Sequence, residues 1–330
     1  NDAPVLQQIQ AKAATEDGAA LSGKFTSTDV DDNETATYTA STVDGFTLNP
    51  DGRYSFDPSH GAYQHLAAGK DQTITIPITV TDHNGGTDTK NLVITVHGTN
   101  DKAIITGQDT GDITEDTNLN SSNDLHVSGK LDITDVDTGE NQLNFHGYNK
   151  TALHGSYGRL QVSNDGSWGY KANSAQAAVQ ALGIGESLTD IIAVTSKDGT
   201  SHNITITIKG TNDIPVIASI ATKSIDEGAS LVSGQITSTD IDHGDTATYS
   251  TTATHPGFIL NPNGSYTLDP TNTAFEHLAV GEHETITIPV IATDNNTGVS
   301  APQNLVITIS GTNDLPIITG TSTGAVIEAG

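Results

Sequence analysis

The stretch Thr73–Thr81 reads TITIPITVT, in which aliphatic residues alternate strictly with threonine or proline. A period of two predicts a β-strand with one buried face, because successive side chains of a strand point to opposite sides. Nearly the same stretch returns at Thr285–Thr293 as TITIPVIAT, and a related version, LTDIIAVT, lies at Leu188–Thr195. The strand is therefore one part of a repeated unit.

Three full repeats and the start of a fourth account for the whole chain. The tetrapeptide GTND occurs at residues 98–101, 210–213 and 311–314, and FTLNPDGRYSFDP (46–58) matches FILNPNGSYTLDP (258–270). We place the repeats at 1–99, 100–211 and 212–312, followed by the opening of another at 313–330. That opening resembles the start of repeat 2, so we expect two alternating repeat types in a longer array.

Each repeat is domain-sized and can bury its own core. Asp-Gly and Asn-Gly turns, such as Asp51-Gly52 and Asn263-Gly264, join strands into hairpins. About seven short strands per 100 residues predict an all-β protein of tandem immunoglobulin-like β-sandwiches, arranged end to end as a rod. A short helix is expected only where Ser174–Leu182 reads SAQAAVQAL, about two turns.

Composition narrows the classes of function. There is no cysteine, so no disulfide contributes to stability, and 40 acidic residues against 13 basic ones give a net charge of −27. Without a basic stripe, no nucleic-acid partner is expected. No apolar run reaches the length of a membrane helix, and no signal peptide opens the chain.

The acids recur at fixed places in every repeat. A glutamate lies 15 residues after the Asn of each Asn-Asp pair, an Asp-x-Asp follows it, and a further acid precedes the next Asn-Asp. The glutamates are Glu16, Glu115 and Glu227, with Glu328 in the tail. The Asp-x-Asp pairs are Asp29 and Asp31, Asp135 and Asp137, and Asp240 and Asp242, and the late acids are Asp82, Asp198 and Asp294.

Strand geometry predicts where these acids meet. We expect Pro4–Thr15 to form one strand that ends at Glu16, beside the outgoing linker Asn100-Asp101. The junction of repeats 1 and 2 should then gather Glu16, Asn100, Asp101, Asp135, Asp137 and Asp198. The junction of repeats 2 and 3 should gather Glu115, Asn212, Asp213, Asp240, Asp242 and Asp294. Equivalent sets at the two ends contain Asn1, Asp2, Asp29, Asp31 and Asp82, and Glu227, Asn313 and Asp314.

Sets of hard oxygen ligands repel one another unless a cation lies between them. Six to eight carboxylate and carbonyl oxygens suit Ca²⁺ better than Mg²⁺ or zinc, so we predict calcium as the cofactor. The alternative is that these acids only cap turns, as Asp and Asn often do. Recurrence of the complete set favours metal binding.

These segments resemble a known family. Repeat 2, with YGRLQVSNDGSWGY (157–170) and TSKDGTSHNITITIKGTND (195–213), resembles the VCBS repeat, and repeats 1 and 3 resemble bacterial cadherin-like repeats. The resemblance implies a cadherin-like sandwich, calcium between domains and a giant RTX-type adhesin of a Gram-negative cell surface, exported by type I secretion for attachment and biofilm formation. Repeat 2 departs from the pattern, with Ser196 in place of the late Asp and Lys102-Ala103 after its linker.

No enzyme is expected. The twelve histidines form no H-E-x-x-H motif, and no G-x-S-x-G sequence is present. His65 and His277 align on what we expect to be a short apolar helix, and Trp168 aligns with Tyr54 and Tyr266, which favours core packing.

Two functions remain. One is an extender that holds distal adhesive domains away from the cell, as a monomeric rod whose other partners are neighbouring repeats of the chain, without membrane insertion. The alternative is a repeat that itself binds a glycan or protein. Repeat 2 carries two polar insertions, 118–125 and 139–157, with few aromatic residues (Phe145, Tyr148 and Tyr157). This favours the extender.

Overall fold

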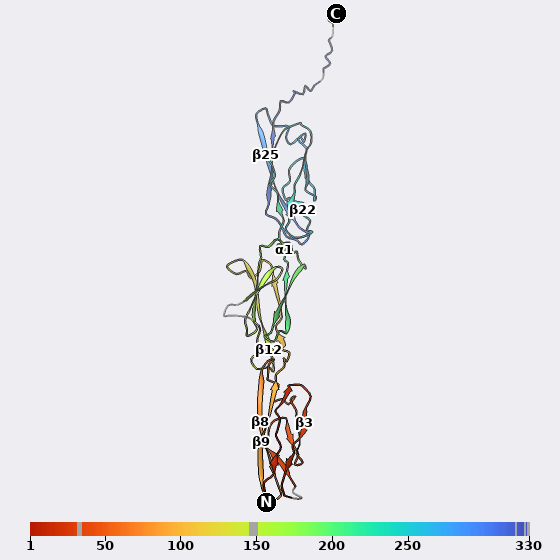
Figure 1. Ribbon diagram of the computed structural model, residues 1–330. Helices are drawn as coiled ribbons and strands as arrows, with labels where there is room; N and C mark the ends of the chain where they lie inside the picture. The colour runs from red at the N-terminus through yellow and green to blue at the C-terminus, as the bar shows by residue number, and fades with distance from the viewer. Residues whose placement is uncertain (32–34, 145–150, 321, 327, 329–330) are drawn as a thin grey trace. The chain divides into compact units, whose positions relative to one another are not determined.

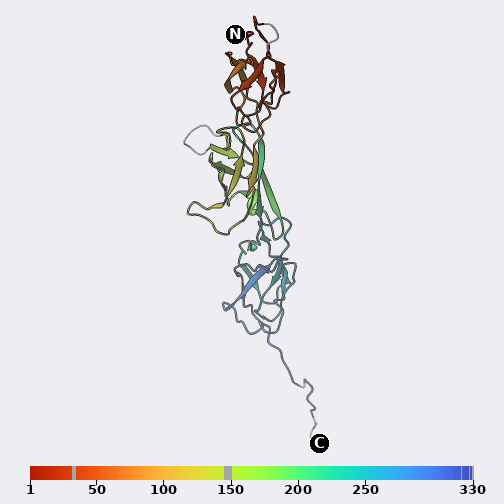
Figure 2. The same ribbon diagram turned by 90° about the horizontal axis from the view of Figure 1, so that it is seen from below.

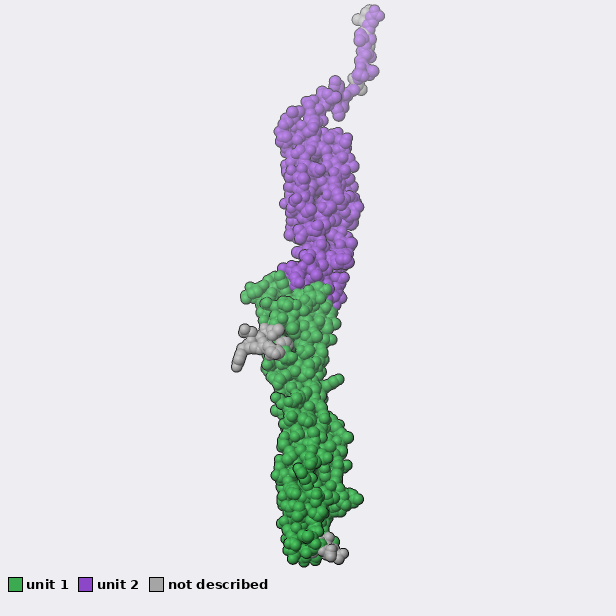
Figure 3. All heavy atoms as spheres, in the orientation of Figure 1, with its two compact units in different colours: residues 1–113, 118–173, 189–207 green, residues 114–117, 174–188, 208–330 purple. Residues whose placement is uncertain are grey.

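The computed structural model describes residues 1–31, 35–144, 151–320, 322–326 and 328. Strands make up nearly all of the regular structure, and within these ranges the one helix is α1 (Ala177–Gln180), so no described helix is long and apolar enough to cross a membrane. The all-β prediction is confirmed. The chain divides into two compact units, which are residues 1–113, 118–173 and 189–207 (unit 1) and residues 114–117, 174–188 and 208–330 (unit 2) (Figure 3).

The first part of unit 1 contains three small sheets. Their strand orders are β1-β4, β2-β9-β8-β5 and β3-β7-β6 (Figure 1). The strands are β1 (Val5–Leu6), β2 (Lys12–Thr15), β3 (Leu21–Lys24), β4 (Ser27–Thr28), β5 (Thr37–Ala40), β6 (Phe46–Leu48), β7 (Arg53–Phe56), β8 (Asp71–Thr81) and β9 (Thr87–His97). Pairing is antiparallel throughout these sheets except between β2 and β9, which run parallel.

A single apolar core holds these sheets together as a β-sandwich. Alternate residues of the β8–β9 hairpin, such as Ile76 and Ile94, are fully buried. They pack in one cluster with Tyr54 and Phe56 of β7, which belongs to another sheet. The alternation read in Thr73–Thr81 therefore directs one face of β8 into the core, as expected for a half-buried strand.

The expectation of one continuous strand over Pro4–Thr15 is wrong. The segment forms two strands in different sheets, since β1 pairs antiparallel with β4 while β2 pairs parallel with β9. Between them Ile9 turns its side chain onto the core. The break has a physical reason. Each of the two facing sheets of a sandwich has an edge with backbone groups to pair, and one segment that pairs first with one sheet and then with the other satisfies both edges.

The rest of unit 1 is coloured yellow to green in Figure 2. It is built mainly on a five-stranded sheet of order β10-β12-β15-β14-β13. A three-stranded sheet has the order β11-β17-β16. The strands are β10 (Ile104–Gly107), β11 (Thr110–Thr114), β12 (Asp124–Thr134), β13 (Thr151–His154), β14 (Gly158–Val162), β15 (Ser167–Asn173), β16 (Ser187–Thr195) and β17 (Ser201–Lys209). Residues 145–150, with Phe145 and Tyr148 of the predicted insertion, lie outside the described residues.

Trp168 is a core residue of β15. It is 3% exposed, and its Nε1–H donates to the carbonyl oxygen of Gln108 at 2.7 Å. The indole covers Gly129 so closely that a Cβ there would lie 2.4 Å from the ring. The same relation joins Gly23 to Tyr54 and Gly234 to Tyr266, with the aromatic ring 2.7 Å and 2.4 Å from where the Cβ would lie.

Unit 2 repeats the arrangement seen at the start of unit 1. Its sheets have the orders β18-β21, β19-β26-β25-β22 and β20-β24-β23, around a core that includes Tyr266, Ile288 and Ile307. The strands are β18 (Val216–Ile217), β19 (Lys223–Asp226), β20 (Val232–Gln235), β21 (Ser238–Thr239), β22 (Thr248–Ser250), β23 (Phe258–Leu260), β24 (Ser265–Leu268), β25 (His283–Thr293) and β26 (Gln303–Ser310). Each range predicted as a full repeat thus carries its own strands, while the exact limits stay a prediction.

The helix expected over Ser174–Leu182 is shorter than its sequence indicated. Only the single turn of α1 forms, and its N-terminus has no side-chain cap. The segments carrying His65 and His277 are turns, held by bonds such as Leu66 N–H to Tyr63 O, so the expectation of a helix there is wrong. One hydrogen-bonded turn is too short to propagate a helix, and the core contacts of its apolar residues decide its shape.

Candidate metal centre

In each repeat, one glutamate directly follows a strand. Its carboxylate accepts a hydrogen bond from the segment that leads out of the repeat. Glu16 Oε1 accepts the backbone N–H of Thr99 at 2.6 Å, and Glu115 Oε1 accepts that of Thr211 at 2.7 Å. Glu227 makes the same bond to Thr312 at 2.6 Å. All three glutamates are at most 6% exposed. The parallel pairing of β2 with β9 explains the contact, because it brings Thr15 level with His97, three residues before the linker Asn100-Asp101.

The linker aspartate is bonded to the Asp-x-Asp loop of the following repeat. In unit 1 the backbone N–H of Asp101 donates to Asp137 Oδ2 at 2.9 Å. In unit 2 Asp213 donates in the same way to Asp242 at 2.8 Å. Each Asp-x-Asp also closes a tight turn, in which the second residue's N–H donates to the first carboxylate.

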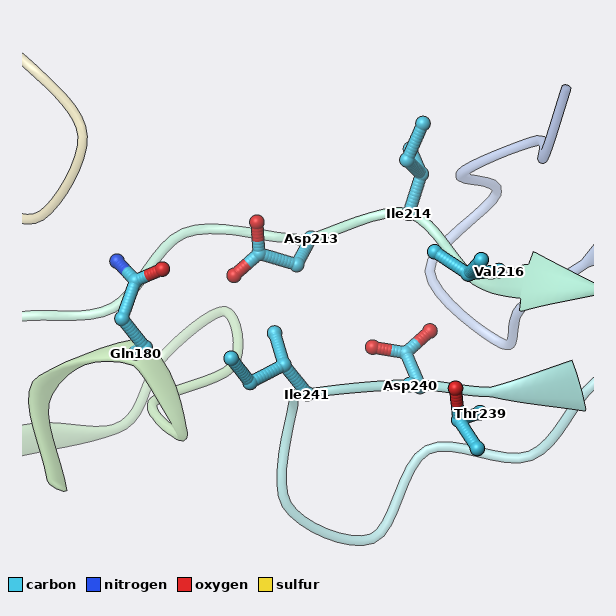
Figure 4. A pocket seen from close by; sticks show the side chains of 7 residues that line it. All are labelled: Gln180, Asp213, Ile214, Val216, Thr239, Asp240 and Ile241. Atoms are coloured by element: carbon cyan, nitrogen blue, oxygen red, sulfur yellow. The ribbon is translucent and has the colours of Figure 1, made fainter. Parts of the chain in front are cut away.

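These bonds form two separate groups of three carboxylates each. Glu16, Asp101 and Asp137 each offer an oxygen within 4.8 Å of the other two, and so do Glu115, Asp213 and Asp242. All residues of the first group belong to unit 1, and all of the second belong to unit 2. Beside the second group, an open pocket of about 550 Å³ is lined by Gln180, Ile214, Val216, Thr239 and Ile241 together with the carboxylates of Asp213 and Asp240 (Figure 4).

Many oxygens of these groups are buried without a hydrogen-bond donor. Among the described residues, twelve buried side-chain atoms lack a partner, and eleven of them belong to residues predicted as metal ligands. The eleven are Glu16 Oε2, Asp29 Oδ2, Asp101 Oδ2, Glu115 Oε2, Asp135 Oδ2, Asp137 Oδ1, Asn212 Oδ1, Asp213 Oδ2, Glu227 Oε2, Asp240 Oδ2 and Asp242 Oδ1. Every one is an acceptor, so a bound cation would satisfy them.

The pKa values reflect the same crowding. Burial, opposed by the hydrogen bond from Thr211 and assisted by the nearby carboxylates of Asp213 and Asp242, raises the pKa of Glu115 to about 7. Burial, followed by repulsion from neighbouring acids, also raises the pKa of Asp101 and Asp213. A cation bound among these carboxylates would lower their pKa values again.

The late acids lie beside the linker asparagine rather than inside these groups. Asp294 accepts the side-chain amide of Asn212 at 3.0 Å, and Asp82 accepts that of Asn1 at 3.1 Å. Burial opposes their ionisation, but these amides and the backbone N–H groups of their own loops lower the pKa of both acids.

Repeat 2 uses a different arrangement at this point. Asp198 accepts the N–H of Ala103 at 3.2 Å and the hydroxyls of Ser196 and Thr200, which together lower its pKa despite burial. Ser196 stands where repeats 1 and 3 have an aspartate. It donates a hydrogen bond to Asp198 and provides no carboxylate itself.

The remaining predicted ligands lie at the ends of the chain or in the linkers. Asp2, at the start of unit 1, donates its N–H to Asp31 at 2.8 Å. This is the same bond that Asp101 makes to Asp137 and Asp213 makes to Asp242. The amides of Asn100, Asn212 and Asn313 each donate to the carbonyl oxygen of the next residue. Asp314 lies in the exposed tail.

Asp245 is a candidate ligand that the sequence patterns above did not identify. Its carboxylate lies with those of Asp240 and Asp242, all within 4.8 Å. A signal existed, because an acid lies three residues after the second Asp in every repeat, as Glu34, Glu140 and Asp245. Glu34 lies outside the described residues.

Comparison with known proteins identifies the family of the chain. A family model described as "Bacterial cadherin-like domain" matches residues 1–98 and 100–210, which is more than half of the chain. No curated protein matches.

Solved structures share the fold at low identity. Protocadherin Gamma B2 extracellular cadherin domains 1-5 are 17% identical with a TM-score of 0.54, covering 96% of this chain and 61% of that one. Human CDH23 EC21-23 is 16% identical with a TM-score of 0.50, covering 93% and 100%. The Protocadherin GammaB4 extracellular domain is 15% identical with a TM-score of 0.50, and this chain spans 49% of its length.

Proposed function

The chain belongs to the bacterial cadherin-like domain family, and from this premise we propose that it is a calcium-stiffened extender segment of a giant bacterial cell-surface adhesin. In that role it holds distal adhesive domains away from a Gram-negative cell for attachment and biofilm formation, after export by type I secretion. The single observation that carries the proposal is the set of eleven buried, unpartnered ligand oxygens.

The donor set favours calcium over other metals. Two groups each combine a glutamate, a linker aspartate and an Asp-x-Asp residue. All of their members are carboxylates. Hard oxygen donors in this number suit Ca²⁺, whereas zinc sites in proteins usually include His or Cys. Bound calcium would supply the positive charge that the buried oxygens lack.

Stiffening follows from which segments the ligands occupy. In unit 2, Glu115 directly follows strand β11 of the preceding repeat, Asp213 lies in the linker, and Asp242 lies in the loop of the next repeat. Without a cation the three carboxylates repel one another, and the linker is held mainly by its hydrogen bonds to Glu115 and Asp242. With a cation, the same residues tie the linker to the repeat on either side of it.

The alternative, a repeat that binds a glycan or protein itself, has less support. Stacking on a sugar needs an exposed aromatic ring, yet Trp168 is 3% exposed and fills a core position. Tyr54 and Tyr266, its counterparts, are buried as well.

Small-angle scattering with and without calcium tests the proposal. We expect the radius of gyration and the longest intramolecular distance of the complete chain to rise when calcium is added to chelator-treated protein. Asp213→Asn should reduce this response, while Asp165→Asn, in an exposed hairpin turn, should leave it unchanged. Superimposable scattering curves, with calcium shown to be bound, would contradict stiffening.

A further inference from the structure

A row of basic side chains crosses the five-stranded sheet of repeat 2. Lys171 of β15 lies directly opposite His126 of β12 on one side and Arg159 of β14 on the other. Arg159 in turn lies opposite His154 of β13. All four side chains are exposed, and residues paired in this way point to the same face of a sheet. We call these four residues the basic row, which extends over roughly 14 Å because neighbouring strands lie about 4.8 Å apart.

No carboxylate is paired with the basic row in the described part of the chain. Among the described residues, none of its four side chains takes part in an ion pair. The acid nearest to it on these strands is Asp124, two residues before His126, and its carboxylate accepts the side-chain amide of Asn120 at 3.3 Å. Like charges directly opposite one another destabilise a sheet, so the pairing of Lys171 with Arg159 has a cost that a bound anion would offset.

The basic row is specific to repeat 2. Three residues after the aligned aromatic residue of the core, repeat 2 has Lys171, whereas repeats 1 and 3 have Asp57 and Asp269. By strand register, Arg159 corresponds to Gly45 of repeat 1. Strand β13 lies in the longer insertion of repeat 2, and within the described residues the sheets β3-β7-β6 and β20-β24-β23 have no such strand. The basic row is therefore an addition to the repeated fold and not a part of it.

The surface beside the basic row favours a polar polymer over a folded protein. The adjacent row on the same face consists of Ser128, Gly169, Gln161 and Ala152. Among the described residues, no large hydrophobic side chain of β12, β13, β14 or β15 is exposed. Protein interfaces usually have an apolar or aromatic centre, and single-stranded nucleic acids stack their bases on aromatic rings. The basic row contains no Phe, Tyr or Trp for either purpose.

We propose that the basic row binds a linear acidic polysaccharide, a polymer of uronic acids. Such a polymer carries one carboxylate per sugar ring, at a spacing similar to that of neighbouring strands, so several carboxylates meet the row together. Lys171 provides a point charge and Arg159 a planar fork that fits a carboxylate. His126 and His154 extend the row at its two ends, each with a ring N–H that donates in either protonation state.

This contact uses charge and hydrogen bonds, so it does not need the exposed aromatic ring that stacking on a sugar requires. The net charge of −27 repels a polyanion at long range, but physiological salt screens exposed charges beyond about 8 Å. Within that distance the uncompensated cations of the basic row determine the local attraction. The calcium centres take no part in it.

Fluorescence anisotropy of a dye-labelled oligogalacturonate, titrated with the complete chain, tests the proposal. Excess chelator in the buffer prevents calcium from bridging the acids of the protein and the sugar. The double variant Lys171→Gln, Arg159→Gln should raise the dissociation constant about tenfold, because it removes two charge contacts. The matched control is Lys24→Gln, Arg53→Gln, which neutralises a directly opposed basic pair of repeat 1 in which Arg53 is already paired with Asp51. The control should leave the dissociation constant unchanged.

Three outcomes would overturn the proposal. The first is equal weakening in the two double variants, which would mean that only net charge matters. The second is an unaltered chain that does not bind the oligogalacturonate or binds a labelled neutral maltodextrin as tightly. The third is equally tight, row-dependent binding of a labelled oligothymidylate, which would assign the basic row to nucleic acid. Circular dichroism of each variant checks that the strands remain folded.

The result is independent of the proposed function. Because the titration is done without calcium, failure of the oligogalacturonate to bind leaves the calcium-stiffened extender standing. Conversely, scattering curves that do not respond to calcium would contradict the extender and leave binding by the basic row untouched.

Discussion

Glu115 Oε1 accepts the backbone N–H of Thr211 at 2.7 Å, although the two residues are 96 positions apart. The bond joins the beginning of predicted repeat 2 to its end. It places the glutamate at the outgoing linker Asn212-Asp213, although Asn100 is much nearer to it in the sequence. Glu16 with Thr99 and Glu227 with Thr312 repeat the relation, 83 and 85 positions apart. Each glutamate therefore serves the linker that follows its repeat.

Removal of calcium should lower thermal stability. A ligand that binds only the folded state stabilises it by about 2.7 kcal/mol at a hundredfold excess over its dissociation constant. Scanning calorimetry in millimolar calcium and in excess chelator should show the melting temperature falling by several degrees. Identical melting curves in the two buffers would rule out calcium as a stabilising ligand.

Glu115→Gln should weaken calcium binding in unit 2 and spare the group around Glu16 in unit 1. The glutamine keeps a carbonyl oxygen but removes a charge from the group with Asp213 and Asp242. Calorimetric titration measures the free energy of calcium binding. The double variant Glu115→Gln, Asp242→Asn should lose less of it than the sum of the two single losses, with a coupling of about 0.5–3 kcal/mol. Glu16→Gln is the matched control and should affect only the other group. Strict additivity would mean that Glu115 and Asp242 do not share an ion.

The stability of the calcium-free protein should depend on pH through Glu115. Burial raises the pKa of this carboxyl to about 7 in the folded state, above its ordinary value of 4.5. The folded state thus holds the proton more tightly than the unfolded state, so this contribution is complete below the unfolded pKa and is lost as the pH rises through about 7. In chelator, the free energy of unfolding should fall over this interval, and it should fall less in Glu115→Gln. Equal slopes for the two proteins would contradict this assignment.

Calcium affinity should change in the opposite direction over the same pH interval. Protons compete with the cation for the carboxylate of Glu115, so binding should strengthen from about pH 5 to pH 8 and then level off. Titrations at several pH values measure this directly. An affinity that does not vary with pH would show that Glu115 is already ionised in the calcium-free protein.

Gly129→Ala should destabilise the five-stranded sheet of unit 1. The added methyl group would lie 2.4 Å from the indole of Trp168, so the ring must move, at a cost of roughly 1–3 kcal/mol. Gly169→Ala on the neighbouring strand is the control, because nothing lies within 4 Å of its Cβ position. Urea denaturation followed by tryptophan fluorescence should separate the two. Equal midpoints would mean that the core yields at Gly129 without strain.

The sequence by itself determined the strand class, the repetition and most of the carboxylates that the structure brings together. Alternation in Thr73–Thr81 settles the buried face of β8, because side chains of a strand alternate whatever it packs against. Recurrence of Glu16, Glu115 and Glu227 at one offset identified the carboxylates that accept hydrogen bonds from the linkers, without any knowledge of their neighbours. Both signals are local, so a single chain contains them in full.

Only the tertiary structure decided where strands change sheet and which acids share a group. The break between β1 and β2 depends on hydrogen-bond partners that arrive some 20 and 80 residues later, in β4 and β9, and no local pattern marks it. Asp245 joins its group through the fold of its loop and the donors Asn295 and Asn296, about 50 residues onward. Asp82 and Asp294 lie beside the linker asparagines, whose side-chain amides donate to their carboxylates. Such choices depend on contacts between distant segments, and these exist only once the sandwich has formed.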